Sequence, residues 1–317
     1  MRPIRHAAFA ILSTLAATPS IADPWPQRAV RVIVPNPPGS AVDLAARLFS
    51  ERLAARWRQP VVVENRLGAD GIVAATGFVN ARDNHTLLFS FAGLITINPL
   101  IHEKLSYDPA RDIVPISSAA VNFFAIAAAK SLNVNSLAEF LALARSQPGK
   151  LNWAATPGLP QYAFAALQKG AGLNIPQVAY RDFAPALQDF AEGRIQALST
   201  SLTLLLPQVQ AGKAKMLLVT TRERSPLLPE VPTAQEAGHP EVTFEGVVGF
   251  YGWRDISAEL KNRIAADIRA VAMDPVIGER LATAGTIVRA STPAEFAAAI
   301  EDQRIKVAAV LQSPGGN

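Results

Sequence analysis

Cysteine is absent from the 317-residue sequence, and histidine occurs only four times. Without a thiol, the chain can form no disulfide, no thiolate metal site and no lipid attachment through cysteine. His6 lies in the first 22 residues, while His85, His102 and His239 are far apart and lack the spacing of a zinc site. The sequence therefore predicts a protein with neither a disulfide framework nor a metal or other cofactor.

The motifs of common enzyme classes are also missing. The sequence has no Gly-x-Ser-x-Gly nucleophile elbow, no Gly-x-x-x-x-Gly-Lys phosphate loop and no Gly-x-Gly-x-x-Gly dinucleotide fingerprint. Aspartate and glutamate occur mostly where helix caps and solvated helix faces are expected, not in pairs suited to acid–base catalysis. We therefore predict a protein that is not an enzyme, with a periplasmic enzyme as the least favoured alternative.

Long hydrophobic runs and clustered charges are lacking as well. No stretch of eighteen uncharged apolar residues follows the leader, which argues against an obvious transmembrane helix. The formal net charge of +4 falls to +2 when Arg2 and Arg5 are removed with the leader, and the other basic residues are scattered. Nucleic-acid binding is therefore not expected.

The first 22 residues have the layout of a secretory signal peptide. Arg2 and Arg5 precede a short apolar segment at 7–17, and residues 20–22 (Ser-Ile-Ala) place small side chains three and one before a cut. A terminal membrane anchor is the alternative, but the apolar segment is too short to span a bilayer. We expect cleavage after residue 22 and a free periplasmic protein that begins near Asp23.

The 295 residues left after cleavage exceed what one hydrophobic core usually holds, so we expect two domains. Strand and helix patterns alternate, which predicts an α/β fold with parallel strands covered by helices. The expected division is 23–122 plus 244–317 for lobe 1, and 123–243 for lobe 2. The predicted strands are 30–34, 60–64, 85–90, 119–129, 151–155, 177–180, 195–200, 215–220 and 247–251, and the longer predicted helices are 161–170, 184–191, 258–272, 275–284 and 293–311.

The turn after the first predicted strand is the first candidate for a binding site. Residues 35–39 (Pro-Asn-Pro-Pro-Gly) cannot continue the strand, and a helix follows them. Ser40 and Asp43 match the Ser-x-x-Asp form of a capping box, with Ser40 as the N-cap. Free backbone N–H groups and the helix dipole at such a terminus can hold an anion. An ordinary capped turn without a ligand is the alternative.

A second glycine-containing turn follows the next predicted strand. Residues 65–71 (Asn-Arg-Leu-Gly-Ala-Asp-Gly) precede another helix, and Phe91 and Ala92 follow the third strand. Because the carboxyl ends of parallel strands meet at one edge of a sheet, these turns are expected to face the same ligand.

A series of short motifs runs through nearly all of the mature chain. In order, they are Trp25-Pro26-Gln27-Arg28, Val32-Ile33-Val34-Pro35, Pro38-Gly39 with Asp43 and Ala46-Arg47, Val63-Glu64-Asn65-Arg66 with Gly68-Ala69 and Gly71, Ile97-Asn98-Pro99-Leu100, Tyr107-Asp108-Pro109 with Asp112, Pro148-Gly149-Lys150-Leu151, Tyr180-Arg181, Pro185-Ala186-Leu187, Gly193-Arg194, Ala211-Gly212-Lys213, and Val231-Pro232-Thr233 with Glu236-Ala237-Gly238. Each motif is weak alone, but their order and spacing resemble the tripartite tricarboxylate transporter receptor family, the Bug-type extracytoplasmic solute-binding proteins.

The resemblance implies a two-domain periplasmic-binding-protein (Venus flytrap) fold of a type II-like kind, with crossover strands between the lobes. It implies that the lobes close on a small carboxylate held mainly by backbone N–H groups and water. The ligand would be a di- or tricarboxylate, an amino acid or an aromatic acid. A monomeric receptor would pass it to the membrane permease subunits of a tripartite tricarboxylate-type transporter. A sensor kinase is the alternative membrane partner.

The sequence departs from the family pattern at positions that bear on ligand charge. Asp70 and Asp182 stand where the family commonly has glycine, and Tyr162 stands where it often has histidine. An aspartate facing the cleft would repel a second carboxylate and favour a cationic or neutral polar end. The alternatives are solvated turn aspartates and a tyrosine that packs on the cleft wall. The predicted ligand-binding residues are Asn36, Gly39, Ser40, Ala41 and Asp43 in the first turn, Gly68, Ala69, Asp70 and Gly71 in the second, Phe91 and Ala92 after the third strand, and Thr156, Tyr162, Asp182, Thr200 and Ser201 across the cleft.

Overall fold

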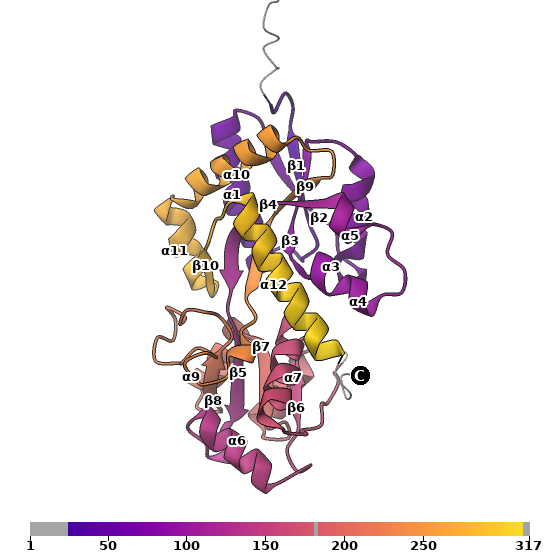
Figure 1. The fold of residues 1–317 in the computed structure, drawn as a ribbon. Helices are drawn as coiled ribbons and strands as arrows, with labels where there is room; N and C mark the ends of the chain where they lie inside the picture. Colours follow the sequence, from indigo (N-terminus) through magenta and orange to yellow (C-terminus); the bar gives the residue numbers. More distant parts are fainter. Residues whose placement is uncertain (1–24, 181–182, 313–317) are drawn as a thin grey trace, which may run out of the picture.

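The computed structural model describes residues 25–180 and 183–312, and these residues form two lobes, each built on its own β-sheet (Figure 1). The predicted signal peptide lies outside the described residues. Within them, no helix combines the length and the hydropathy that a bilayer crossing requires.

Lobe 1 contains a six-stranded sheet with the order β10-β4-β9-β3-β1-β2. Strands β1, β2 and β3 are parallel, but β9 pairs antiparallel with both β3 and β4. The predicted parallel pairing of the first three strands is confirmed, while β9 is antiparallel because it enters the sheet directly from lobe 2 and not through a βα unit. The strands are β1 (Val30–Val34), β2 (Val61–Asn65), β3 (Thr86–Phe91), β4 (Ile113–Asn122), β9 (Gly246–Trp253) and β10 (Thr286–Val288).

Helices cover both faces of this sheet, and β9 shows how the faces divide. Phe250 packs with the cluster under α1, α10 and α11, whereas its neighbour Tyr251 packs with the cluster under α2 and α12. This alternation is the period of two that a strand buried on both faces requires. The helices are α1 (Ala41–Trp57), η1 (Ala69–Gly71), α2 (Ile72–Ala81), α3 (Gly93–Thr96), α4 (Asn98–Ile101), α5 (Pro109–Asp112), α10 (Ala258–Ala272), α11 (Pro275–Thr283) and α12 (Pro293–Leu311).

Lobe 2 contains a four-stranded sheet with the order β6-β7-β5-β8, in which β5 is antiparallel to both neighbours. The prediction of a strand at 177–180 is wrong. Gln177 forms one isolated bridge with Trp153, and the three-residue β6 is too short to support a longer ladder. The elements are β5 (Phe124–Ala129), η2 (Lys130–Leu132), α6 (Leu137–Ser146), β6 (Trp153–Ala155), α7 (Leu159–Ala171), α8 (Phe183–Ala191), β7 (Ala197–Ser201), α9 (Leu202–Gln210), β8 (Ala214–Val219) and η3 (Pro240–Val242).

The chain crosses between the lobes at two places. The single strand predicted at 119–129 is divided at Phe123, so that β4 belongs to lobe 1 and β5 to lobe 2. The Phe123 carbonyl accepts a hydrogen bond from Leu202 N at 2.9 Å, which turns the backbone away from a continuous ladder. The return crossing is at 243–246 and leads directly into β9.

Helix α12 makes a third connection, because it contributes side chains to the cores of both lobes. Phe296 and Ile300 pack in a cluster of lobe 1, while Val307 and Val310 pack in a cluster of lobe 2. Figure 1 shows this helix, in yellow, running diagonally from the upper lobe to the lower one.

Packing of α12 against β9 leaves no room for a side chain at Gly249. A Cβ built there would lie 2.5 Å from Phe296 Cζ and 2.5 Å from the backbone oxygen of Ser117, and Phe296 is fully buried. We expect Gly249→Ala to lower the free energy of unfolding by about 1–3 kcal/mol in urea denaturation. The control is Gly278→Ala on α11, where nothing lies within 4 Å, and its stability should be unchanged or slightly higher. Equal losses in the two variants would contradict the packing argument.

Candidate functional site

The two predicted turns lie against each other at the carboxyl ends of β1 and β2. The side chain of Asn65, the last residue of β2, donates from Nδ2 to the backbone oxygen of Asn36 at 2.9 Å. A Cβ added to Gly71 would lie 3.2 Å from Pro35 Cβ, so the second turn is in close contact with the first. The predicted juxtaposition of the turns at one sheet edge is confirmed.

The Asp43 carboxylate holds this edge together. It is 2% exposed, and it accepts hydrogen bonds from Gly39 N (2.9 Å), Arg47 Nε (2.9 Å) and Asn65 Nδ2 (2.8 Å). Burial raises the pKa of Asp43, but the hydrogen bonds from Arg47, Asn65 and Gly39 outweigh it and keep the pKa below its ordinary value. With these donors in place, Asp43 positions the turns.

The start of α1 leaves two backbone donors unused. Ser40 is the N-cap as predicted, and its Oγ accepts from Asp43 N at 3.2 Å. The capping box also predicts a hydrogen bond from Ser40 N to the Asp43 carboxylate. This prediction is wrong, since the carboxylate accepts from Gly39 N and not from Ser40 N. The N–H groups of Ala41 and Val42 come first in the helix, and they have no hydrogen-bond partner among the described residues. They are the donors available to an anion at this terminus.

A buried acceptor without a partner lies in the same turn. The side-chain oxygen of Asn36 is inaccessible and has no hydrogen-bond donor among the described residues. An unpaired buried amide oxygen costs free energy. The structure shows no donor that offsets this cost within the described residues.

The second turn has a left-handed backbone at four consecutive residues. The φ angle is 122° at Gly68, 47° at Ala69, 51° at Asp70 and 83° at Gly71. Left-handed conformations cost non-glycine residues roughly 1–2 kcal/mol each. The turn closes on itself through a hydrogen bond from Gly71 N to Gly68 O at 3.0 Å. Such backbone strain is typical of functional sites.

Two buried polar side chains that sequence reasoning did not place in the site support this turn. Asn98 donates from Nδ2 to Asp70 O at 3.1 Å and also to the Tyr107 hydroxyl at 3.3 Å. The Tyr107 hydroxyl in turn donates to Leu94 O at 2.8 Å. The Asp70 carboxylate lies 3.0 Å from His102 Nε2, with the Asp70 side chain 59% exposed. The only sequence signal for Asn98 and Tyr107 is that they belong to the Asn-Pro and Tyr-Asp-Pro motifs.

The residues predicted after the third strand have structural partners. Ala92 is buried and is the N-cap of α3, and its carbonyl accepts from the Thr96 hydroxyl at 3.1 Å. Phe91 packs against clusters of both lobes, and its ring lies 6.3 Å from the ring of Phe124 in β5. Phe91 therefore belongs to the contact between the lobes.

Among the lobe 2 candidates, Thr156 and Thr200 meet. Thr156 donates from Oγ1 to Thr200 Oγ1 at 3.2 Å, and its backbone N–H donates to Ser199 O at the same distance. The Ser201 hydroxyl instead contacts Thr203 Oγ1 at 2.9 Å, at the start of α9. The structure thus joins two of these hydroxyls directly and pairs the third with α9.

Tyr162 links α7 of lobe 2 electrostatically with the second turn of lobe 1. Its side chain is 7% exposed, and burial raises the pKa of the phenol. The negative charge of Asp70 also raises the pKa of Tyr162, and this effect is smaller than that of burial. Asp182 lies outside the described residues. The described residues contain no group of three or more His, Asp or Glu side chains placed to hold a metal ion.

The pKa of Asp43 predicts a pH-dependent stability. Because the folded pKa lies below the ordinary one, ionised Asp43 stabilises the fold at neutral pH, and this contribution is lost as pH falls through the folded pKa. We expect Asp43→Asn to lower the free energy of unfolding by about 1–3 kcal/mol at pH 7. The difference from wild type should shrink below about pH 4.

Urea denaturation from pH 7 to pH 3 measures this difference. The control is Glu103→Gln, which removes one exposed carboxylate and should follow the wild type throughout. An Asp43→Asn deficit of constant size across this range would show that lost packing, and not lost charge, is responsible.

Comparisons with known proteins identify the family of this chain. A family model described as tripartite tricarboxylate transporter family receptor matches residues 45–315. A UPF0065 protein of Pseudomonas sp. (strain P51) is 31% identical over 276 residues, covering 86% of this chain and 82% of that protein. An R. palustris protein solved with adipate is 27% identical, with a TM-score of 0.76, covering 91% of this chain and 98% of that one. MatC from Rhodopseudomonas palustris, solved with bound malate, is 26% identical, with a TM-score of 0.70 and coverages of 91% and 100%.

These similarities confirm the expected two-domain periplasmic-binding-protein fold. The family and the structural neighbours are periplasmic solute-binding proteins and not enzymes. Since the family model spans most of the sequence, this chain belongs to the tripartite tricarboxylate transporter receptor family.

Proposed function

We propose that the protein captures a small organic carboxylate between its lobes and delivers it to the membrane subunits of a tripartite tricarboxylate-type transporter. The observation that carries this proposal is the pair of unused N–H groups, Ala41 and Val42, at the start of the 17-residue helix α1. A carboxylate there would accept both hydrogen bonds at the positive end of the helix dipole. Similar proteins solved with adipate and malate, both carboxylates, support the choice of ligand class.

The arrangement needs no arginine to bind the carboxylate directly. Arg47, the nearest cation along α1, donates to Asp43 and to Asn65 Oδ1 at 2.9 Å each. Its charge is therefore used to position the turn. When the lobes close over the ligand, water is excluded and the fixed N–H dipoles act at low dielectric. Thr156 and Tyr162 would line the opposite wall, from lobe 2.

The second turn would set the preference for the other end of the ligand. The Asp70 carboxylate is more than half exposed and lies within electrostatic range of Tyr162. It would repel a second carboxylate and attract a cationic or donor-bearing group. The unpartnered Asn36 oxygen also favours a donor. We therefore propose a ligand with a carboxylate at one end and an ammonium or neutral polar group at the other.

The remaining parts of the proposal concern the location of the protein and its membrane partner. Residues 1–22 would direct export and be removed, so that the receptor acts as a monomer in the periplasm. A permease is the proposed partner because the family is defined by its tripartite transporter. Proximity of its gene to permease genes would support this partner, whereas proximity to a sensor kinase gene would favour the alternative.

Calorimetry with two ligands of matched length tests the function and the role of Asp70. In 6-aminohexanoate, an aminomethyl group with its ammonium charge replaces one carboxylate of adipate. We expect the wild type to bind 6-aminohexanoate about tenfold more tightly than adipate, since the charge at the far end meets Asp70. Asp70→Asn tolerates the left-handed backbone and should remove most of this preference.

The control is Glu279→Gln, which changes the net charge equally on an exposed part of α11. It should retain the wild-type preference. Failure of mono-, di- and tricarboxylates alike to bind would contradict the proposed function. Binding with the same ratio of affinities in Asp70→Asn and wild type would identify Asp70 as a solvated turn residue.

A further inference from the structure

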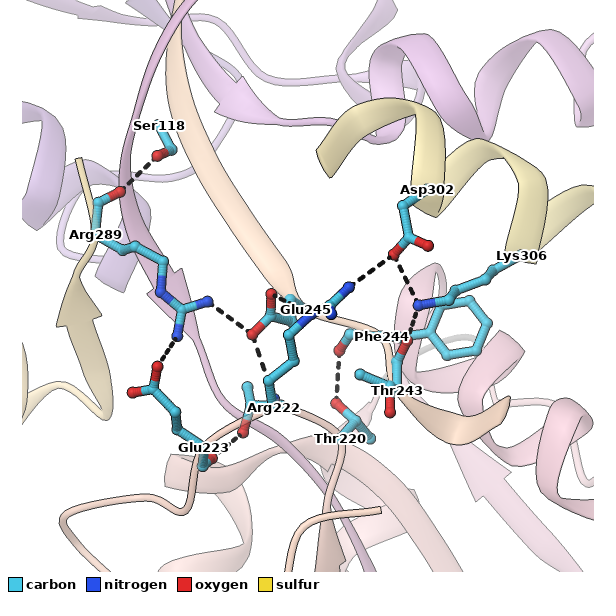
Figure 2. Close-up of polar contacts among 11 residues, drawn as sticks. Ser118, Thr220, Arg222, Glu223, Thr243, Phe244, Glu245, Arg289, Asp302 and Lys306 are labelled. Atoms are coloured by element: carbon cyan, nitrogen blue, oxygen red, sulfur yellow. Dashed lines mark hydrogen bonds and ion pairs between the residues drawn. The ribbon is translucent and has the colours of Figure 1, made fainter. Parts of the chain in front are cut away.

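A cluster of charged side chains lies where the lobes join, separate from the candidate site (Figure 2). Five of its six members line a cavity of about 440 Å³ bounded by α12 and the return crossing. Cations and anions are equal in number, and each cation has an anionic partner, so the cavity has no unpaired cation to attract an anionic ligand. The six are Arg222, Arg289 and Lys306 with Glu223, Glu245 and Asp302.

Glu245 is the centre of this cluster. It lies on the return crossing, and its side chain is only 15% exposed. Its Oε1 accepts from Arg289 Nη1 at 2.7 Å and from the backbone N of Arg222 at 3.3 Å, and its Oε2 lies 3.6 Å from Arg222 Nε. One carboxylate therefore contacts a residue from each lobe.

Two further ion pairs join residues of lobe 2 to lobe 1 and to α12, the helix shared by both lobes. Arg289 Nη2 lies 3.1 Å from Glu223 Oε1, and Arg222 Nη2 lies 3.3 Å from Asp302 Oδ2. Arg289 belongs to lobe 1 and follows β10, whereas residues 222 and 223 follow β8 of lobe 2. Asp302 is on α12. A rotation of one lobe relative to the other would change both distances.

The groups that carry these charges are fixed to their own lobes. The Arg289 backbone is bound to β4, since its oxygen accepts from Ser118 Oγ at 2.6 Å. On the lobe 2 side, Thr220 Oγ1 donates to Phe244 O at 2.7 Å. Figure 2 shows these two anchors on opposite sides of the cluster. The backbone is therefore hydrogen-bonded on both sides of the cluster, beside Arg289 and beside Glu245.

Lys306 ties α12 to the return crossing. Its Nζ donates to Asp302 Oδ2 at 2.7 Å and to the backbone oxygen of Thr243 at 3.2 Å. Asp302 is thereby held in position between Lys306 and Arg222 (Figure 2). The contacts converge on the short segment at which the chain passes between the lobes.

We propose that this cluster is an electrostatic latch that sets the angle between the lobes, with Glu245 as its positioning residue. Isolated exposed ion pairs contribute little, but here the pairs share partners and act on the same relative motion of two rigid bodies. Within the described residues, the latch has no hydrogen bond or ion pair to the candidate site. It would change ligand affinity by changing the angle at which the two walls of the site meet. This effect on affinity rests on the proposed function.

Because the chain has no cysteine, two cysteines can be introduced and spin-labelled to follow the angle between the lobes through one distance. Spin labels at Met273→Cys, an 81% exposed position at the end of α10, and Ala142→Cys, on the exposed face of α6, report one interlobe distance. Pulsed electron paramagnetic resonance on the ligand-free protein gives the distribution of this distance. We expect Glu245→Gln to shift or broaden it. Raising the salt concentration from 0.1 M to 1 M should change the wild type in the same direction, because the Debye length falls from about 10 Å to about 3 Å.

Two further variants separate the latch from a general loss of folding. Glu223→Gln changes a side chain that is 68% exposed and removes one lobe-to-lobe pair, so it should change the distance with little loss of melting temperature. The matched control is Glu301→Gln, which breaks a pair with Arg304 formed within α12. It should leave the distribution unchanged, although it removes the same charge next to Asp302.

Ligand titration of the same variants completes the test. We expect Glu245→Gln to change the dissociation constant for adipate or 6-aminohexanoate by about three- to tenfold, and Glu301→Gln to leave it unchanged. Shifted distances without binding of any carboxylate would support the latch and contradict the proposed function. Wild-type distances in both Glu245→Gln and Glu223→Gln would overturn the latch, whatever the ligands do.

Discussion

The arrangement of the candidate site depends on one buried carboxylate. Asp43 collects donors from its own turn, its own helix and the end of the neighbouring strand β2. A buried charge is tolerated only when such partners are present, so the two turns are fixed relative to each other by the need to satisfy it. The donors that remain are the first N–H groups of α1. A chemically generic feature, a helix terminus, is thereby held in a fixed position at the candidate site.

Much of the fold could be predicted because local signals were strong. Helices α10 and α12 begin and end where predicted, and α12 has Pro293 in its first turn and a complete capping box between Thr292 and Glu295. The errors concern strands, since pairing is decided by distant partners. The segment 119–129 reads as one apolar run, although Phe123 divides it, and the three-residue β10 has no local pattern that distinguishes it from a loop.

The candidate site could be predicted only in part. The glycines and the capping serine located both turns, because those residue types act on the backbone close to them in the sequence. The supporting side chains act across long sequence separations: Asn65 reaches the first turn, and Asn98 reaches the second. The residues next to either asparagine in the sequence do not predict these contacts. The left-handed conformation at Ala69 and Asp70 was equally hidden, since only the flanking glycines hinted at unusual backbone angles.

Helix α12 also has a consequence for the order of folding. Lobe 2 has its last strand at β8, which ends at Val219, yet Val307 and Val310 in α12 complete one of its hydrophobic clusters. During synthesis, this cluster therefore lacks two of its side chains until nearly the whole chain has been made. The two lobes are expected to fold cooperatively, as a single unit and not one after the other. Such late closure would suit a chain that crosses a membrane before it folds.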